Sequence, residues 1–191
     1  MVRLTTIYTK AGDGGRTRLG DMSEADKHDP RVEAYGTVDE ANAAIGIAIA
    51  ALPDGHELHD VLTAVQNDLF DAGADLCVPD RGEALEWEPL RLAPDQTARL
   101  EAEIDALNAR LEPLDSFVLP GGSPASAALH LARTITRRAE RRVVALRSTG
   151  EPVSAPVVTY LNRLSDLLFV AARIANEEGR ADVKWTPGGA R

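Results

Sequence analysis

The sequence predicts an all-α protein, a five-helix up-and-down bundle with an irregular N-terminal arm. Of its 191 residues 44% are hydrophobic but only 4% aromatic, a composition that favours helices over sheet. Apolar residues recur at helical spacing in five segments, whereas the first thirty residues lack such spacing. Because this length suits one domain with a substantial core, we expect a single domain over residues 1–191. It would comprise an arm (1–30), a helical bundle (31–178) and a tail (179–191).

The arm is rich in glycine and threonine. Four of the 15 glycines of the chain lie before residue 30. We expect an ordered loop there, with at most a short strand at Thr5–Thr9.

Helix boundaries follow from proline, glycine and capping residues. Pro30 suits a first helical turn, and Pro53 together with Gly55 ends that helix. Ser123 is a good N-cap, and Pro124 suits the first position of the fourth helix. Residues 78–94 predict a long surface connection. The helices are expected at residues 30–52, from 58 to at least 72, 94–111, 124–148 and 155–172.

Charge and cysteine content exclude several classes of protein. The formal net charge of -9 disfavours binding to nucleic acid or anionic membranes unless the cations are gathered in one place. The single cysteine excludes an internal disulfide and any multi-thiolate metal site. The N-terminus lacks the apolar stretch of a signal peptide, and no window reaches eighteen apolar residues. We therefore expect a cytoplasmic protein that binds neither nucleic acid nor membranes.

The arm contains the motif TKAGDGGRT, residues 9–17. Glycines allow backbone N–H groups to converge on an anion, and Lys10 adds a positive charge. The spacing is not that of a P-loop. The motif is therefore interpreted as an anion-binding loop, with ordinary turn residues in a flexible arm as the alternative.

A ridge of arginines is expected on the fourth helix. Arg133, Arg137 and Arg141 are spaced by four residues, so their guanidinium groups share one face and span about 12 Å, the length of a triphosphate. Arg138 and Arg142 are turned by about 100° and could face a neighbouring chain. A solvated basic face is the alternative, although repulsion between like charges on adjacent turns argues against it.

Other polar residues give weaker signals. Asp39 lies beside the apolar stripe of the first helix and needs a partner, for which the arginine ridge is the candidate. An internal salt bridge would be its structural role. Asn162 lies on an otherwise apolar helix, where interhelical hydrogen bonding is the simpler explanation. His56 and His59 lack a third metal ligand nearby, so no metal ligands are identified.

Taken together, the motifs resemble those of the PduO-type ATP:cob(I)alamin adenosyltransferases. The matching segments occur in the order TKAGDGGRT, KHDPRVEAYGTVDEANAAIG, FVLPGG, ARTITRRAERRVVAL and YLNRLSDLLFVAAR. The resemblance implies transfer of the 5′-deoxyadenosyl group of ATP to the cobalt of cob(I)alamin, giving adenosylcobalamin and triphosphate. It also implies a homotrimer with active sites between subunits and Mg²⁺ accompanying ATP. A flavin-dependent reductase and an adenosylcobalamin-dependent mutase would be the partner enzymes.

The resemblance further implies which residues form the site. Asp39 and Arg133 match an ion pair on the corrinoid side, and Phe117 matches the aromatic residue that crowds the lower face of cobalt. Together with Arg137, these three are the expected catalytic residues. The expected ATP-binding residues are Thr9, Lys10, Gly12, Asp13, Gly15, Thr17, Lys27, Arg137, Arg138, Glu140, Arg141 and Asn162.

The chemistry agrees with the residue types. Cobalt(I) is itself the nucleophile, so no Ser–His pair is required, and the leaving triphosphate needs positive charge. Two alternatives remain at this point: a non-catalytic nucleotide sensor or corrinoid chaperone, and a nucleic-acid binder that uses the arginine ridge.

Overall fold

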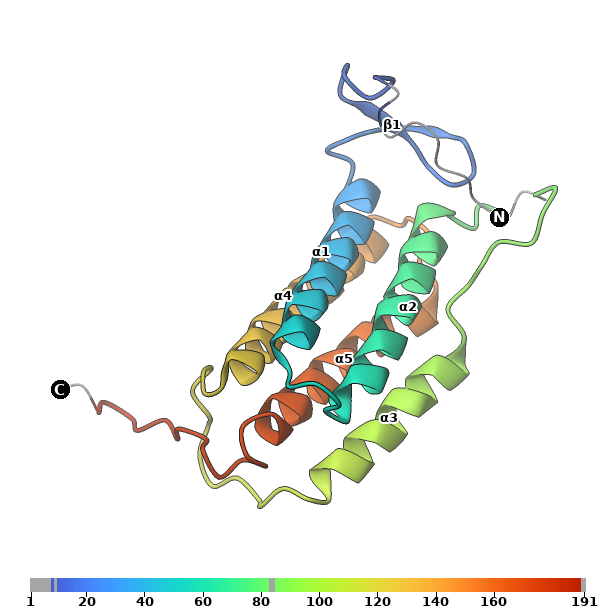
Figure 1. Ribbon diagram of the computed structural model, residues 1–191. Coiled ribbons are helices and arrows are strands. Elements are labelled where there is room, and N and C mark those ends of the chain that lie inside the picture. Colours follow the sequence, from blue (N-terminus) through green and yellow to red (C-terminus); the bar gives the residue numbers. More distant parts are fainter. Residues whose placement is uncertain (1–7, 9, 83–84, 190–191) are drawn as a thin grey trace.

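Five helices form the body of the molecule, and a two-stranded hairpin lies at one end of it (Figure 1). The computed structural model describes Tyr8 and residues 10–82 and 85–189. Successive helices alternate in direction, so the expected up-and-down bundle is confirmed. Helix α1 packs on α2 and α4, while α5 packs on α4 and α3. The elements are β1 (Arg16–Arg18), β2 (Glu24–Asp26), α1 (Pro30–Ala51), α2 (Leu58–Cys77), α3 (Pro94–Asn108), α4 (Pro124–Ser148) and α5 (Ala155–Ile174).

The helices begin where their capping residues predict. The Asp29 carboxylate accepts a hydrogen bond from the backbone N–H of Arg31 at 2.7 Å, directly before Pro30. The Ser123 hydroxyl accepts one from the N–H of Ser126 at 3.1 Å and so caps α4. Each cap satisfies an N–H that has no partner within the helix. These caps confirm the starts of the first and fourth helices.

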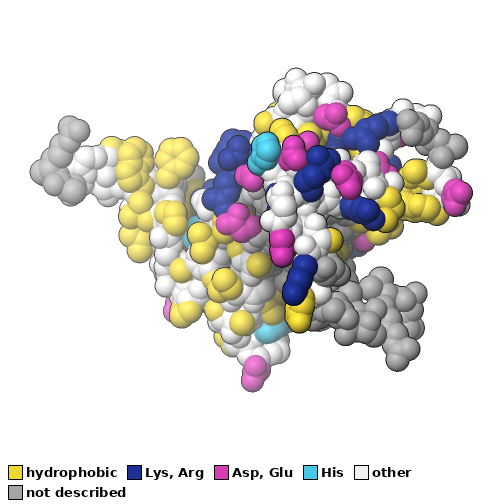
Figure 2. Space-filling model, turned by 90° about the horizontal axis from the view of Figure 1, so that it is seen from above, with side chains coloured by type: hydrophobic (Ala, Val, Ile, Leu, Met, Phe, Trp, Pro, Cys, Tyr) yellow, Lys and Arg dark blue, Asp and Glu magenta, His cyan; other side chains and the backbone are white. Residues whose placement is uncertain are grey.

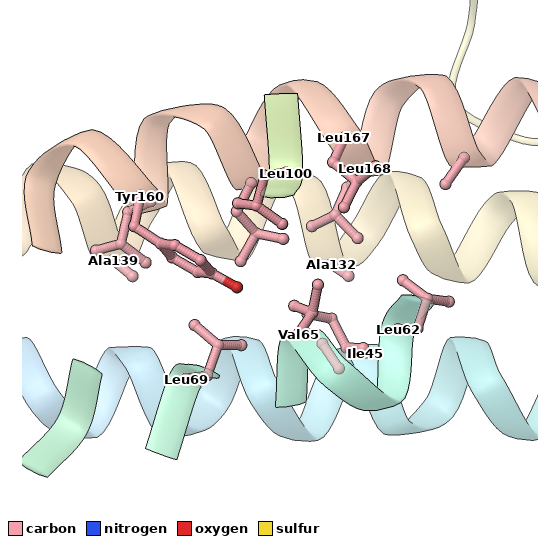
Figure 3. Close-up of a cluster of buried hydrophobic side chains, with 14 of the residues drawn as sticks. Ile45, Leu62, Val65, Leu69, Leu100, Ala132, Ala139, Tyr160, Leu167 and Leu168 are labelled. Carbon is pink, nitrogen blue, oxygen red and sulfur yellow. The ribbon is translucent and has the colours of Figure 1, made fainter. Parts of the chain in front are cut away.

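The apolar faces of the helices meet in one core (Figure 3). Ile45 of α1, Leu69 of α2 and Leu168 of α5 are buried there. The core also encloses a polar contact, in which the Tyr160 hydroxyl donates to the Asp68 carboxylate at 2.8 Å. Burial and the adjacent negative charge raise the pKa of Tyr160, so its hydroxyl stays protonated and remains a donor.

The arm contains more regular structure than expected. Strands β1 and β2 pair in antiparallel fashion, with Thr17 opposite Ala25. The strand expected at Thr5–Thr9 lies outside the described residues, apart from Tyr8. The hairpin was missed because its strands are only three residues long and carry exposed charged side chains rather than an apolar alternation.

The hairpin is fixed to the end of the bundle where α1 begins and α2 ends. The N–H of Gly20 donates to the Cys77 carbonyl at 2.9 Å. A Cβ atom at Gly20 would lie 2.5 Å from Cγ2 of the buried Val78, so only glycine allows this approach. The arm is thus held against the bundle at a defined place.

A buried arginine joins the same end of the bundle to the connection between α4 and α5. Arg31 is 2% exposed. Its guanidinium donates to the Leu76 carbonyl at 2.9 Å, to the Pro152 carbonyl at 2.9 Å and to the Glu151 carboxylate at 3.0 Å. Such a buried charge is stable only because every contact is an acceptor.

No helix in the described part of the chain is long and apolar enough to cross a membrane.

Candidate functional site

Two cavities lie toward opposite ends of the molecule. One, of about 600 Å³, is formed by the arm and is lined by residues that include Gly12, Thr17 and Lys27. The other, of about 790 Å³, is lined by residues that include Phe117 and Arg133, near the beginning of α4 and the end of α5. From above (Figure 2), basic and acidic side chains alternate over the arm end, while hydrophobic side chains gather along the projecting tail.

The arm cavity brings together residues that are separated in the sequence. The N–H of Lys27 donates to the Gly15 carbonyl at 2.9 Å, which closes the loop. The Lys27 ammonium lies over Gly12, where an added Cβ would meet Nζ at 3.0 Å. Lys10 and Gly15 have φ angles of 58° and 82°, so the loop backbone curls tightly. The cavity therefore combines backbone N–H groups with a lysine, the combination that binds anions.

The other arm residues differ in their exposure and in their contacts. Asp13 is exposed, and its N–H donates to the Lys10 carbonyl at 3.3 Å. Arg16 and Arg18 also line the cavity, although they were not predicted as site residues. The two arginines are two residues apart on β1 and so share one face of the strand. A prediction of this strand would therefore have placed both arginines on the same side of the arm. Thr9 lies outside the described residues.

The five arginines of α4 divide into two sets. Arg138 contacts Glu40 of α1, and Arg142 contacts Glu33 of α1 at 3.2 Å. Within the chain both arginines thus contact carboxylates of α1, which packs on α4, and the suggestion that they face a neighbouring chain stays a prediction. In contrast, no ion pair involves any member of the arginine ridge, within the part of the chain that the structure describes. The ridge members are Arg133, Arg137 and Arg141.

Arg133 is the least accessible member of the ridge. Its Nε is buried and has no hydrogen-bond partner among the described residues. Burial, followed by the positive charge of Arg137, lowers the pKa of the Arg133 guanidinium. A buried donor without an acceptor is costly in free energy. The position therefore favours binding of a negatively charged or carbonyl group.

Asp39 does not pair with the ridge in its own chain. It is exposed, and no ion pair of its carboxylate occurs among the described residues. The neighbouring Glu40 contacts α4 instead, at Arg138, and a pairing of Asp39 with the ridge stays a prediction. A helix turns by about 100° per residue, so adjacent residues face different neighbours.

Glu140 and Asn162 join α4 to α5. The Asn162 side-chain NH2 donates to the Glu140 carboxylate at 3.0 Å, and Arg163 donates to Oδ1 of the Asn162 side chain at 2.8 Å. The interhelical hydrogen bond considered for Asn162 is thus confirmed. It also fixes the Glu140 carboxylate one turn from Arg137.

The second cavity has an aromatic wall. Phe117 is 77% exposed, and its ring packs against Trp185 with centroids 6.0 Å apart. Phe169 of α5 also lines the cavity and contacts the buried His130 edge-on at 6.1 Å. Trp185 and Phe169 were not predicted as site residues. Because only 4% of the residues are aromatic, a tryptophan in the tail was the one feature of the sequence that could have pointed to this wall of the cavity.

The described residues include no group of three or more His, Cys, Asp or Glu side chains that could hold a metal ion. His56 accepts a hydrogen bond from the N–H of Leu58 at 3.2 Å, and His59 contacts the Pro53 carbonyl at 3.0 Å. Both histidines thus have structural partners at the start of α2.

Comparisons with known proteins agree on one family. The cobalamin adenosyltransferase family model matches residues 7–175. The chain is 54% identical to a corrinoid adenosyltransferase of Mycobacterium tuberculosis, covering 100% of this chain and 97% of the relative. A Bacillus subtilis corrinoid adenosyltransferase is 45% identical, over 94% of this chain and 91% of the relative.

Solved structures give the same result. A variant of the PduO-type ATP:corrinoid adenosyltransferase from Lactobacillus reuteri, complexed with cobalamin and ATP, superimposes with a TM-score of 0.84. Its sequence is 38% identical, and the match covers 94% of this chain and 96% of that one. The chain therefore belongs to the cobalamin adenosyltransferase family, enzymes that transfer the adenosyl group of ATP to the cobalt of a corrinoid.

Proposed function

We propose that the enzyme acts as a homotrimer whose sites lie between adjacent subunits, each joining the arm of one chain to the ridge and aromatic cavity of the next. The distance between the two cavities supports this arrangement. Leu146, beneath the hairpin, and Arg133, in the aromatic cavity, are about 20 Å apart along the axis of α4. A neighbouring arm would supply the phosphate-binding loop that the aromatic cavity lacks.

Unpaired charges are the observation that carries the proposal. Arg133 has a buried Nε without an acceptor, and Asp39 is an exposed carboxylate without an ion-pair partner among the described residues. In a trimer, Arg133 would pair with Asp39 of the partner subunit, which would shape the corrinoid side of the site. This pairing would also remove the desolvation cost at Arg133.

ATP would be held from both sides. Arg137 and Arg141, whose guanidinium groups have no ion pair in the described chain, would bind the triphosphate oxygens. Arg138 would join them by exchanging its Glu40 contact for phosphate, and Glu140 with Asn162 would hold the nucleoside end. From the neighbouring arm, the contacts would come from Thr9, Lys10, Gly12, Asp13, Gly15, Thr17 and Lys27.

The reaction is a displacement at C5′ of ATP. The electron pair of cobalt(I) forms the Co–C5′ bond while the C5′–O bond breaks, and its electrons leave with triphosphate. Arginine side chains fixed on one helix stabilise the charge of this leaving group without reorganisation. Cob(I)alamin is thus converted to adenosylcobalamin with no protein base.

Phe117 would assist formation of cobalt(I). An apolar ring against the lower face of the corrin excludes an axial ligand and leaves a four-coordinate cobalt(II), which is more easily reduced. The exposed ring of Phe117 in the aromatic cavity supports this role.

Mg²⁺ would accompany the nucleotide. The described residues contain no protein-only metal cage, so phosphate oxygens and water would be its main ligands, and no protein residue is assigned to it. We also propose a cytoplasmic location. A flavin-dependent reductase and an adenosylcobalamin-dependent mutase would be its partners, since cobalt(I) must be generated and the product consumed.

Subunit mixing tests the shared site. Lys27→Ala removes an arm charge and Arg137→Ala a ridge charge, so each variant alone is expected to have little activity. If the two are co-refolded, adenosylation followed by the visible spectrum should recover to roughly a quarter of wild type, because about one interface in four pairs an intact arm with an intact ridge. Activity no greater than that of either variant would place each site within one chain and overturn the proposal.

A further inference from the structure

We propose that Trp185 is a positioning residue for this reaction. The C-terminal strap, residues 182–185, would hold the Phe117 loop so that the aromatic ring meets the lower face of the corrin. This inference rests on the role proposed above for Phe117. The strap would thus have a role in the reaction, although the sequence predicted only a tail there.

The strap begins at a buried ion pair. Arg173 of α5 donates to the Asp182 carboxylate at 2.8 Å, and their side chains are only 6% and 3% exposed. The Asn176 amide donates to the same carboxylate at 2.9 Å. Between Asn176 and Asp182 the chain reverses its direction through Glu177 and Glu178. The φ angles of these two residues, 56° and 53°, are unusual for residues other than glycine. Such a conformation persists only where the surrounding contacts hold it.

The same cluster holds the far end of the Phe117 loop. Oδ1 of Asn176 accepts a hydrogen bond from the N–H of Ser123 at 3.1 Å. A Cβ atom at Gly122 would lie 2.3 Å from this oxygen, and Gly122 has a φ of 94°. The loop and the strap are therefore fixed to a single buried polar cluster at the end of α5.

From this cluster the strap runs antiparallel to the loop. The N–H of Trp185 donates to the Phe117 carbonyl at 2.7 Å, and the N–H of Leu119 donates to the Val183 carbonyl at 2.8 Å. The Ser116 hydroxyl donates to the Trp185 carbonyl at 2.8 Å. These bonds determine the backbone position of Phe117 on both sides of the residue.

Trp185 also restrains the Phe117 side chain. The two rings are 6.0 Å apart and inclined at 60°, within the range of favourable aromatic pairs. Within the described chain, no other aromatic ring contacts Phe117, which is 77% exposed. Without Trp185 the Phe117 ring would be free to change rotamer toward solvent. A ring that must exclude a ligand from cobalt cannot act in that state.

The test compares full-length variants with bound cob(II)alamin and ATP. Trp185→Ala should reduce the four-coordinate cobalt(II) signal in the electron paramagnetic resonance spectrum. Adenosylation from cobalt(II), with a flavin-dependent reductase supplying the one electron that gives cobalt(I), should slow by about tenfold to a hundredfold, the range expected when a reacting group is misplaced by about 1 Å. Adenosylation from chemically reduced cobalt(I) should stay within about threefold of wild type, because Phe117 acts before that stage.

Two controls separate positioning from a general structural effect. Trp185→Phe keeps an aromatic contact and should restore most of the four-coordinate signal. Trp87→Ala removes a tryptophan of similar exposure, 48% against 44%, far along the chain, and should leave both routes unchanged.

The results distinguish the positioning role of Trp185 from the role proposed for Phe117. If Phe117→Ala removes the four-coordinate signal but Trp185→Ala keeps it, the positioning role is wrong and the proposed function stands. If Phe117→Ala itself keeps the signal, the role proposed for Phe117 fails and the present inference fails with it. Equal losses on the cobalt(II) and cobalt(I) routes for Trp185→Ala would also overturn the positioning role, because they would indicate general damage to the cavity.

Discussion

Replacement of Arg137 by alanine should lower the activity with ATP while leaving the stability of the fold almost unchanged. Arg137 is exposed, and no ion pair or side-chain hydrogen bond engages it among the described residues. Its removal should therefore change the free energy of unfolding by no more than about 0.5 kcal/mol. Removing its like charge should also raise the pKa of Arg133, because Arg137 contributes to lowering that pKa.

The effect on ATP follows from the bonds that the guanidinium would make. A hydrogen bond to a charged group contributes about 1.5–3 kcal/mol. Loss of that amount corresponds to a decrease of roughly 10- to 150-fold in kcat/KM for ATP. The affinity for the corrinoid should change much less, since Arg133 and Phe117 remain in place.

The assay is steady-state adenosylation from pre-reduced cobalt(I), with ATP varied and the visible spectrum recorded. Arg142→Ala is the matched control, because its half-exposed contact with Glu33 at 3.2 Å contributes less than about 1 kcal/mol. A value of kcat/KM for Arg137→Ala within about threefold of this control would refute the phosphate-binding role of the ridge.

Three further changes test the structural basis of the site. Gly20→Ala would place a methyl group against the buried side chain of Val78, so the hairpin should move and KM for ATP should rise. An unchanged KM would show that the contact between the hairpin and the end of α2 is not needed for ATP binding. Arg31→Met leaves one buried carbonyl, one partly buried carbonyl and a carboxylate without their donor. Chemical denaturation should therefore show a loss of about 2–4 kcal/mol in the free energy of unfolding, and a loss below about 1 kcal/mol would contradict the assigned contacts. Burial and the positive charge of Arg133 lower the pKa of His130, against an opposing effect of Asp182. The unfolded state therefore binds more protons, and stability should fall as the pH drops below the ordinary histidine value of about 6.5. His130→Gln should flatten this pH dependence in thermal unfolding between about pH 7 and 5.5, whereas an unaltered slope would exclude His130 as its source.

The sequence alone located all five helices, because their signals are local. Apolar spacing of three and four residues defines a face, and proline or serine at a helix start acts through its own backbone and side chain. The glycine-rich loop of the arm and the arginine ridge were located on the same basis. A helix of known start determines which of its side chains share a face, whatever packs against it.

The pairing of charges required the tertiary structure. The sequence places Asp39 and Glu40 side by side, and only the packing of α1 on α4 decides that Glu40 contacts Arg138. The resulting separation of α4 arginines into paired and unpaired sets could not be predicted from α4 itself. It depends on charges carried by another helix.

The number, order and chemistry of the helices, and the family resemblance that they carry, follow from local residue patterns. Two contacts emerge only once the chain is folded: Trp185 lies on Phe117, 68 positions away in the chain, and Gly20 meets the end of α2. Contacts between distant segments depend on how the whole core packs, so no local pattern encodes them. The surroundings of each candidate site residue were therefore determined by the fold.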